Sequence, residues 1–298
     1  MSFRKDHILS LKPETNFSYV TGETEEAINN LFGEILQNGV HGFCFSLYDE
    51  GQKPGDIISE AQVRRRMEIL KPHTKWIRSF SCTDGNELIP KVAKEYGIKT
   101  LVGAWLGNDP EINKREVEGL IKLAKEGLVD IASVGNEVMY RKDLSEDELL
   151  DFIMKVKAEI PQIPVGYVDA YYEFTHRPRI TEACDVILCN CYPFWEGCQF
   201  ENSLDYMKQM YYQAKTAGKG KQVIITETGW PSQGENLKES VPSEKNARDY
   251  FINTQLWSAN DNIPVFYFSS FDESWKVGAE GTVGAYWGIW DKNENLKF

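Results

Sequence analysis

The sequence lacks several features that would mark whole classes of protein. No apolar run approaches the roughly 18 residues that a membrane-spanning helix needs. The four histidines, at positions 7, 41, 73 and 176, form no i,i+4 pair and no cluster with cysteine. No glycine-rich phosphate motif follows a strand-like run. We therefore expect no membrane span, no metal and no nucleotide or other cofactor.

Basic residues are too few for a nucleic-acid-binding surface. The chain has 33 Lys and Arg against 45 Asp and Glu, a formal net charge of -12, whereas nucleic-acid binding depends on clustered positive charge. Aromatic residues, in contrast, are plentiful, with 14 Tyr, 15 Phe and 8 Trp. Their rings offer flat faces to the C–H groups of sugars, so we expect an uncharged substrate and no nucleic-acid partner.

The six cysteines follow neither a disulfide nor a metal-binding pattern. They lie mostly inside apolar, strand-like segments. The spacing of Cys189, Cys191 and Cys198 matches no common zinc finger, and the first two would share one face of a strand. We expect six reduced, buried thiols.

The N-terminus has no apolar run of about 7 to 15 residues after its basic start, so no secretory signal is visible. The compartment stays open, cytoplasmic in one case and extracellular or periplasmic if a leader has been removed. A lone glycosylation sequon begins at Asn16. Without a repeat or linker, we expect one domain over residues 1–298, a monomer, with residues 1–30 as an N-terminal extension.

Short β-branched and aromatic runs alternate with amphipathic segments along the chain. Strands are predicted over residues 40–47, 75–81, 98–106, 129–136, 164–169, 184–193, 221–226 and 263–271. Helices are predicted over residues 59–70, 86–96, 113–127, 145–160, 204–217 and 243–259. Ser145 and Glu148 have the spacing of a capping box. This alternation predicts a single (β/α)₈ TIM barrel.

Two glutamates follow the fourth and seventh predicted strands. Glu137 and Glu227 are 90 residues apart, or three units of about 30 residues. Active sites of these barrels lie at the C-terminal ends of the strands, which places the two carboxyls opposite each other. Cleavage of a glycosidic bond requires such a pair, one carboxyl to protonate the leaving oxygen and one to attack or stabilise the sugar.

The segments around these glutamates resemble a known family. The segments concerned are Gly135-Asn136-Glu137, Thr226 to Ser232, Cys191 to Phe194, Phe271 to Lys276, Glu280-Gly281 and Trp287 to Ile289. They are similar to glycoside hydrolase family 17, the β-1,3-glucanases and related glucosyltransferases, and closer to its microbial branch. The resemblance implies a retaining double displacement on β-1,3-glucan without a cofactor. Glu137 is then the general acid/base and Glu227 the nucleophile.

Retention requires carboxyls roughly 5 to 5.5 Å apart. The acid must stay protonated near neutral pH, so we expect a less polar environment at Glu137. An ion-paired or hydrogen-bonded environment is expected at Glu227.

Other site candidates surround this pair, each with a structural alternative. Asn136 can donate to the sugar 2-hydroxyl or form a structural turn. Tyr192 can hold the nucleophile through its hydroxyl or belong to the core. Arg78, a charge inside an apolar run, needs a partner; we place it beside Glu227, with a purely structural salt bridge as the alternative.

By resemblance, Glu273 and Lys276 are the acid and lysine of strand eight, and a surface ion pair is their alternative. Trp230 and Trp195 are the first candidates for stacking on glucose, and Tyr48 is a weaker one. Three further rings fall near predicted strand ends, namely Trp105, Trp275 and Trp287. For each tryptophan, packing in the core is the competing interpretation.

The leading hypothesis is a hydrolase acting on a β-glucan, and three others stay open. A β-1,3-glucosyltransferase would use the same glutamates and differ in whether an acceptor sugar or water wins the second step. A non-catalytic glucan-binding barrel would need neither carboxyl. A retaining barrel glycosidase acting on β-mannan, β-galactan or β-1,4-glucan would share the strand-four and strand-seven layout.

Overall fold

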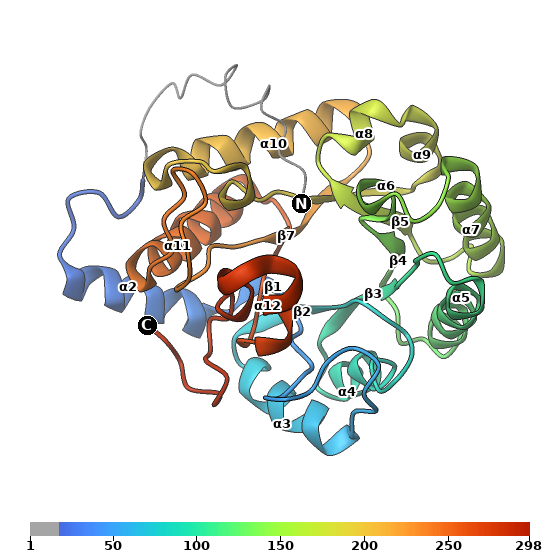
Figure 1. Cartoon of the computed structure of the whole chain (residues 1–298), viewed down its shortest axis with the longest axis horizontal. Coiled ribbons are helices and arrows are strands. Elements are labelled where there is room, and N and C mark those ends of the chain that lie inside the picture. The colour runs from blue at the N-terminus through green and yellow to red at the C-terminus, as the bar shows by residue number, and fades with distance from the viewer. Residues whose placement is uncertain (1–17) are drawn as a thin grey trace.

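The chain folds into a closed barrel of eight parallel strands, and helices surround the strands (Figure 1). The computed structural model describes residues 18–298, so Asn16 of the predicted sequon lies outside the described part. Strands pair in chain order from β1 to β8, and β8 pairs again with β1. The prediction of a single-sheet (β/α)₈ barrel is confirmed.

All eight predicted strands are present, although most are shorter than their apolar runs. They are β1 (Val40–Cys44), β2 (Thr74–Ser79), β3 (Lys99–Ala104), β4 (Ile131–Asn136), β5 (Val165–Ala170), β6 (Val186–Asn190), β7 (Val223–Thr228) and β8 (Val265–Tyr267). The predictions for the first and eighth strands extend beyond the observed strand ends. Past those ends the backbone forms hydrogen bonds with groups outside the neighbouring strands. Ser46 N–H donates to the Ser270 hydroxyl at 2.9 Å, and Ser269 N–H donates to the Trp287 carbonyl.

The six predicted helices also form, and serine side chains cap several of them. They are α3 (Glu60–Leu70), α4 (Leu88–Glu95), α5 (Pro110–Lys125), α7 (Glu146–Glu159), α10 (Ser203–Ala217) and α11 (Glu244–Asp261). The predicted capping box at Ser145 is present, with Glu148 returning the hydrogen bond. Ser59 and Ser243 cap α3 and α11 in the simpler way, each by accepting one backbone N–H.

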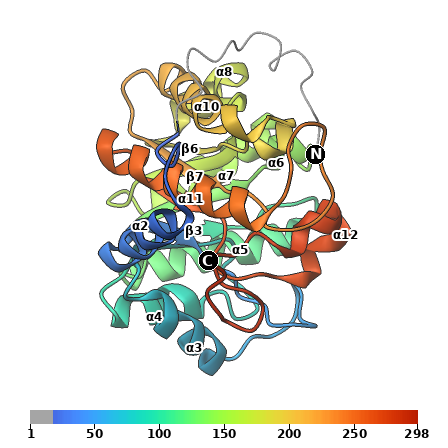
Figure 2. The same cartoon turned by 90° about the vertical axis from the view of Figure 1, so that its left-hand side faces the viewer.

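Several helices were not predicted. They are α2 (Glu25–Asn38), α6 (Val138–Arg141), α8 (Glu173–His176), α9 (Pro178–Ala183) and α12 (Val277–Glu280). The first begins inside the segment assigned above to an N-terminal extension, and it lies beside α11 in both views (Figure 1, Figure 2). Its Phe32 packs edge-to-face on Phe251 of α11, with 5.3 Å between ring centroids. Residues 25–38 are therefore part of the helical layer that covers the barrel.

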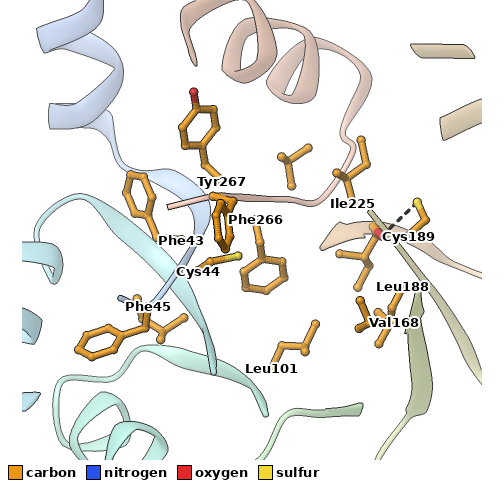
Figure 3. Packing of buried hydrophobic residues seen from close by; sticks show 14 of the residues in the cluster. Phe43, Cys44, Phe45, Leu101, Val168, Leu188, Cys189, Ile225, Phe266 and Tyr267 are labelled. Atoms are coloured by element: carbon orange, nitrogen blue, oxygen red, sulfur yellow. Dashed lines mark hydrogen bonds between the residues drawn. The ribbon is translucent and has the colours of Figure 1, made fainter. Parts of the chain in front are cut away.

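Alternation along the strands separates the barrel interior from the layer beneath the helices. Phe266, Leu101, Val168 and Leu188 point toward one another inside the ring of strands, whereas Tyr267 points the other way (Figure 3). These side chains are all 1% exposed or less. Packed side chains fill the barrel interior, so the site must lie at the C-terminal ends of the strands.

The described residues include all six cysteines. All six cysteines are free and buried, and Cys189 and Cys191 lie with their sulfurs 3.8 Å apart on one face of the chain. Over residues 18–298 no helix combines the length and apolar character needed to cross a membrane.

Candidate active site

Glu227 lies in β7 and is held by a cation and a hydroxyl. Arg78 donates from Nη1 to Glu227 Oε1 at 2.6 Å, and Tyr192 donates from its hydroxyl to Oε2 at 2.8 Å. Glu227 is 6% exposed and Arg78 is 1% exposed, so the pair is screened little by water. Both carboxylate oxygens are thus occupied by donors, as an ionised carboxyl requires.

Arg78 joins three strands through its planar guanidinium. It rises from β2, reaches Glu227 on β7 with one nitrogen, and donates with the other to Asn136 Oδ1 on β4 at 2.7 Å. Its guanidinium also lies 4.2 Å from the centroid of the Phe80 ring. The structure therefore places Arg78 where the sequence predicted it, beside the nucleophile candidate, and gives it a second, positioning contact.

Glu137 follows β4 and has a different environment. It sits in the left-handed region, with φ 51° and ψ 31°, where non-glycine residues are uncommon. Its Oε1 accepts from Asn190 Nδ2 at 3.0 Å. Burial, followed by the charge of Glu227, raises the pKa of Glu137 to about 7. A carboxyl with this pKa holds its proton in much of the protein at neutral pH.

The two carboxyls differ in the groups that contact them. A cation and a hydroxyl donate hydrogen bonds to Glu227, while the Glu137 carboxyl receives the neutral amide of Asn190. Two carboxyls in such unlike environments are suited to different roles in acid–base chemistry. The expected difference in environment is therefore present in the structure.

Asn136 and Asn190 complete the hydrogen bonding around the pair. Because Asn136 Oδ1 accepts from Arg78, its amide N–H₂ faces away from that guanidinium and is oriented to donate elsewhere. Asn190, which sequence reasoning missed, donates to Glu137 while its Oδ1 accepts from Thr226 Oγ1 at 2.9 Å. Its position at the end of β6, on the barrel interior face, was the available signal.

Glu273 and Lys276 form a buried ion pair rather than a surface one. Lys276 Nζ lies 2.7 Å from Glu273 Oε2, and both side chains are less than 10% exposed. The backbone N–H of Tyr48 donates to Glu273 Oε1 at 2.9 Å. Tyr48 thus supports this ion pair through its main chain, and its ring packs edge-to-face on Trp275.

Glu280, at the end of α12, is a third carboxyl of the site that sequence reasoning missed as a site residue. Its Oε2 is buried and accepts no hydrogen bond from the described residues. Burial raises the pKa of Glu280 to about 7; Lys276 opposes this rise, and Glu227 and Glu137 add to it. Glu280 is therefore electrostatically coupled to the other charged residues of the site. The Glu280-Gly281 match in the resemblance was the only signal for it.

Trp230 requires a correction, because it cannot stack on a sugar. It is 1% exposed, its Nε1 donates to the Val241 carbonyl at 3.0 Å, and its ring packs against Phe194 and Tyr250. Both faces are covered by protein. The ring anchors the segment after β7 instead.

The other candidate rings differ in how much surface they offer. Trp195 is half-buried and packs on Trp287, with 5.3 Å between ring centroids. Trp287 is itself buried. Trp105, after β3, is 39% exposed, with the Arg141 guanidinium 4.5 Å from its ring centroid. Among these rings, Trp105 and Trp195 have surface available for a ligand.

Comparison with known proteins identifies the family. A family model described as the BtgE/BtgC glycoside hydrolase domain matches residues 42–288, which include both glutamates. A solved glycoside hydrolase family 17 β-1,3-glucanosyltransferase from Rhizomucor miehei is 29% identical with a TM-score of 0.78, covering 87% of this chain and 96% of that one. The chain belongs to glycoside hydrolase family 17.

As a family 17 member, the protein is a glycoside hydrolase. Its relatives include the glucan 1,3-beta-glucosidase of Saccharomyces cerevisiae, 27% identical over 273 residues, or 82% of this chain and 86% of the relative. The glucan 1,3-beta-glucosidase of Candida albicans is 29% identical over 263 residues, or 78% and 83% of the two chains. An endo-laminarinase from Formosa, 18% identical with a TM-score of 0.73, shares the fold.

Proposed function

We propose that this glycoside hydrolase cleaves β-1,3-glucosidic bonds of laminarin-type glucans with retention of configuration. The observation that supports this most strongly is the unequal pair of carboxyls, an ion-paired Glu227 and a buried Glu137 with a pKa of about 7. The printed names of the similar enzymes support β-1,3-glucan as the substrate class.

In the first step, a Glu227 carboxylate oxygen attacks the anomeric carbon while Glu137 donates its proton to the glycosidic oxygen. The glycosidic bond breaks, the shortened glucan leaves as an alcohol, and a glycosyl ester with Glu227 remains. In the second step, Glu137, now a carboxylate, removes a proton from water, which attacks the anomeric carbon and frees Glu227.

Neighbouring residues assist these steps by holding charge and orientation. Arg78 and Tyr192 stabilise Glu227 whenever it carries its charge. The free amide of Asn136 is placed to donate to the sugar 2-hydroxyl, a bond that strengthens as the transition state forms. Glu273, Lys276 and Glu280 contribute polar contacts to the glucose unit.

Transfer to a sugar acceptor is the second candidate. The similarity to the Rhizomucor miehei glucanosyltransferase, with 96% of that chain covered, favours it. The same glycosyl ester would be resolved by the hydroxyl of another glucan instead of water. Partly exposed rings such as Trp195 are suited to hold such an acceptor.

One experiment separates these functions. Laminaripentaose is incubated with the protein at low and high concentration, and products are followed by chromatography. Hydrolysis yields only shorter products, whose distribution separates endo from exo cleavage, and transfer yields products longer than the pentasaccharide. Binding without turnover would support the non-catalytic barrel. Turnover of β-mannan, β-galactan or β-1,4-glucan in place of β-1,3-glucan would overturn the proposed specificity.

The sequence also predicts a monomer. Light scattering measures the molar mass in solution and tests this prediction.

A further inference from the structure

The turn that carries Glu137 has an unusual local structure. Glu137 is left-handed and directly precedes the four-residue helix α6, and its side chain does not cap that helix. The first N–H groups of any helix lack intrahelical partners and need acceptors from elsewhere. Whatever binds those groups also controls the direction of the Glu137 side chain.

Two side chains of β5 supply the missing acceptors. The Tyr167 hydroxyl accepts from the Met139 N–H at 2.8 Å, and Asp169 Oδ2 accepts from the Tyr140 N–H at 3.3 Å. Tyr167 in turn donates its hydroxyl proton to Asp169 Oδ2. Asp169 Oδ1 accepts from the Ala170 N–H at 2.8 Å. The two residues therefore form one connected network under the first turn of α6.

This network lies outside the substrate cleft. Tyr167 and Asp169 are two residues apart on a strand and share a face, while Val168 between them points into the barrel interior (Figure 3). Tyr167 is 1% exposed and Asp169 is fully buried. Neither can touch a glucan that occupies the strand ends, so any effect on catalysis must pass through the Glu137 turn.

Packing alone does not account for these polar side chains. Burying a carboxyl between a strand and a helix is unfavourable unless its hydrogen bonds are satisfied. Burial, followed by the charge of Glu137, raises the pKa of Asp169 to about 8, which shows how little the site favours the charge. A valine or leucine would fill the same space, but it would leave the α6 N–H groups without partners.

We propose that Tyr167 and Asp169 are positioning residues for the general acid/base. They hold the left-handed turn so that the Glu137 carboxyl points toward the glycosidic oxygen. The proposal rests on the proposed function, because it assigns the network to proton donation by Glu137. It predicts that substitutions of these two residues slow only the step in which the leaving group must be protonated.

The test compares substrates that do and do not need protonation of the leaving group. Tyr167→Phe removes only the hydroxyl. We expect kcat/KM for laminaripentaose to fall by up to about 100-fold, the effect of misplacing a catalytic group by about 1 Å. For dinitrophenyl β-laminaribioside, whose leaving group departs without a proton, kcat/KM should stay within about threefold of wild type, because the acid contributes little there.

The matched control is Tyr267→Phe, the same change at a buried tyrosine of β8 that packs on Phe251 and does not contact α6. It should leave the ratio of the two kcat/KM values unchanged. Asp169→Asn retains one acceptor and should give a smaller, equally selective loss; it also serves if Tyr167→Phe fails to fold. Equal losses on both substrates, or no loss on either, would overturn the proposal. A wild-type protein that cleaves neither substrate would instead overturn the proposed function.

Discussion

The β4 side and the β7 side of the barrel mouth present the same functional group in two different settings. Glu227 lies within β7 and is bound by Arg78 and Tyr192. Glu137 lies one residue beyond its strand, in a left-handed turn, and receives a hydrogen bond from the Asn190 amide. One carboxyl is ion-paired with an arginine, and the other is hydrogen-bonded by a neutral amide.

The comparison shows that two glutamates in one site can differ in environment through the distribution of the donors around them. Arg78 contacts the Glu227 carboxylate directly, whereas on the β4 side it contacts the amide oxygen of Asn136 and not Glu137. The predictions below remove one side of the comparison at a time.

The largest effect is expected from Glu227→Gln, which removes the nucleophile and keeps its shape. Loss of a covalent nucleophile costs about 10⁴- to 10⁶-fold in kcat. Binding of laminaripentaose, measured by calorimetry, should stay within about tenfold of wild type, because a neutral amide still fits the site. Retention of substantial turnover in this variant would disprove the assignment of Glu227.

The next effect is expected from Glu137→Gln. With an unactivated glucan, kcat/KM should fall by about 10²- to 10⁴-fold, the usual contribution of a general acid. With a dinitrophenyl leaving group the loss in kcat/KM should be small. Equal losses on both substrates would indicate that Glu137 has another role.

Arg78→Met tests the cation that distinguishes the two sides. It leaves Glu227 buried without its partner, and breaking a buried pair in this way costs about 3 to 5 kcal/mol of stability. Denaturant unfolding at pH 7 measures the change. Arg78→Lys is the matched variant; it keeps the charge but loses the two-pronged contact to Glu227 and Asn136, so we expect a smaller cost. A wild-type stability for Arg78→Met would show that the ion pair contributes nothing.

A smaller effect concerns pH. Because the pKa of Glu137 is raised from 4.5 to about 7, the unfolded chain releases this proton well before the folded protein does. Folding stability should therefore fall between about pH 4.5 and 7, and kcat/KM should fall as pH rises above about 7. Glu137→Gln cannot titrate, so as the pH rises from 4 to 8 its stability relative to wild type should increase by about 3 kcal/mol. Thermal unfolding at both pH values tests this gain, and parallel curves would contradict it.

Much of the fold and the central pair could be predicted because both depend on local patterns. Apolar runs at strand spacing gave the eight strands, and the residues at their C-terminal ends included Glu137 and Glu227. The ends of the strands were less predictable. Phe45 and Phe268 still pair with neighbouring strands, but beyond them the backbone forms hydrogen bonds with side chains and with the C-terminal segment.

The remaining site features depend on contacts between segments far apart in the chain. Trp230 looked like a sugar platform, yet its indole N–H finds the Val241 carbonyl and its faces are covered by rings from other elements. Glu280 lies beyond the last strand and enters the site only through the fold of the segment after β8. The left-handed turn at Glu137 is stabilised by β5 side chains, which no local pattern reveals.

The reach of Arg78 also has a consequence for how the protein refolds. The arginine is on β2, its two partners are on β4 and β7, and these strands come from both halves of the chain. A half-barrel intermediate of the kind that proteins of this size can populate would contain the helices and much of the sheet, yet its nucleophile would have no counter-ion. Recovery of glucan cleavage during refolding would then report the final closure of the ring and lag behind the return of helical circular dichroism.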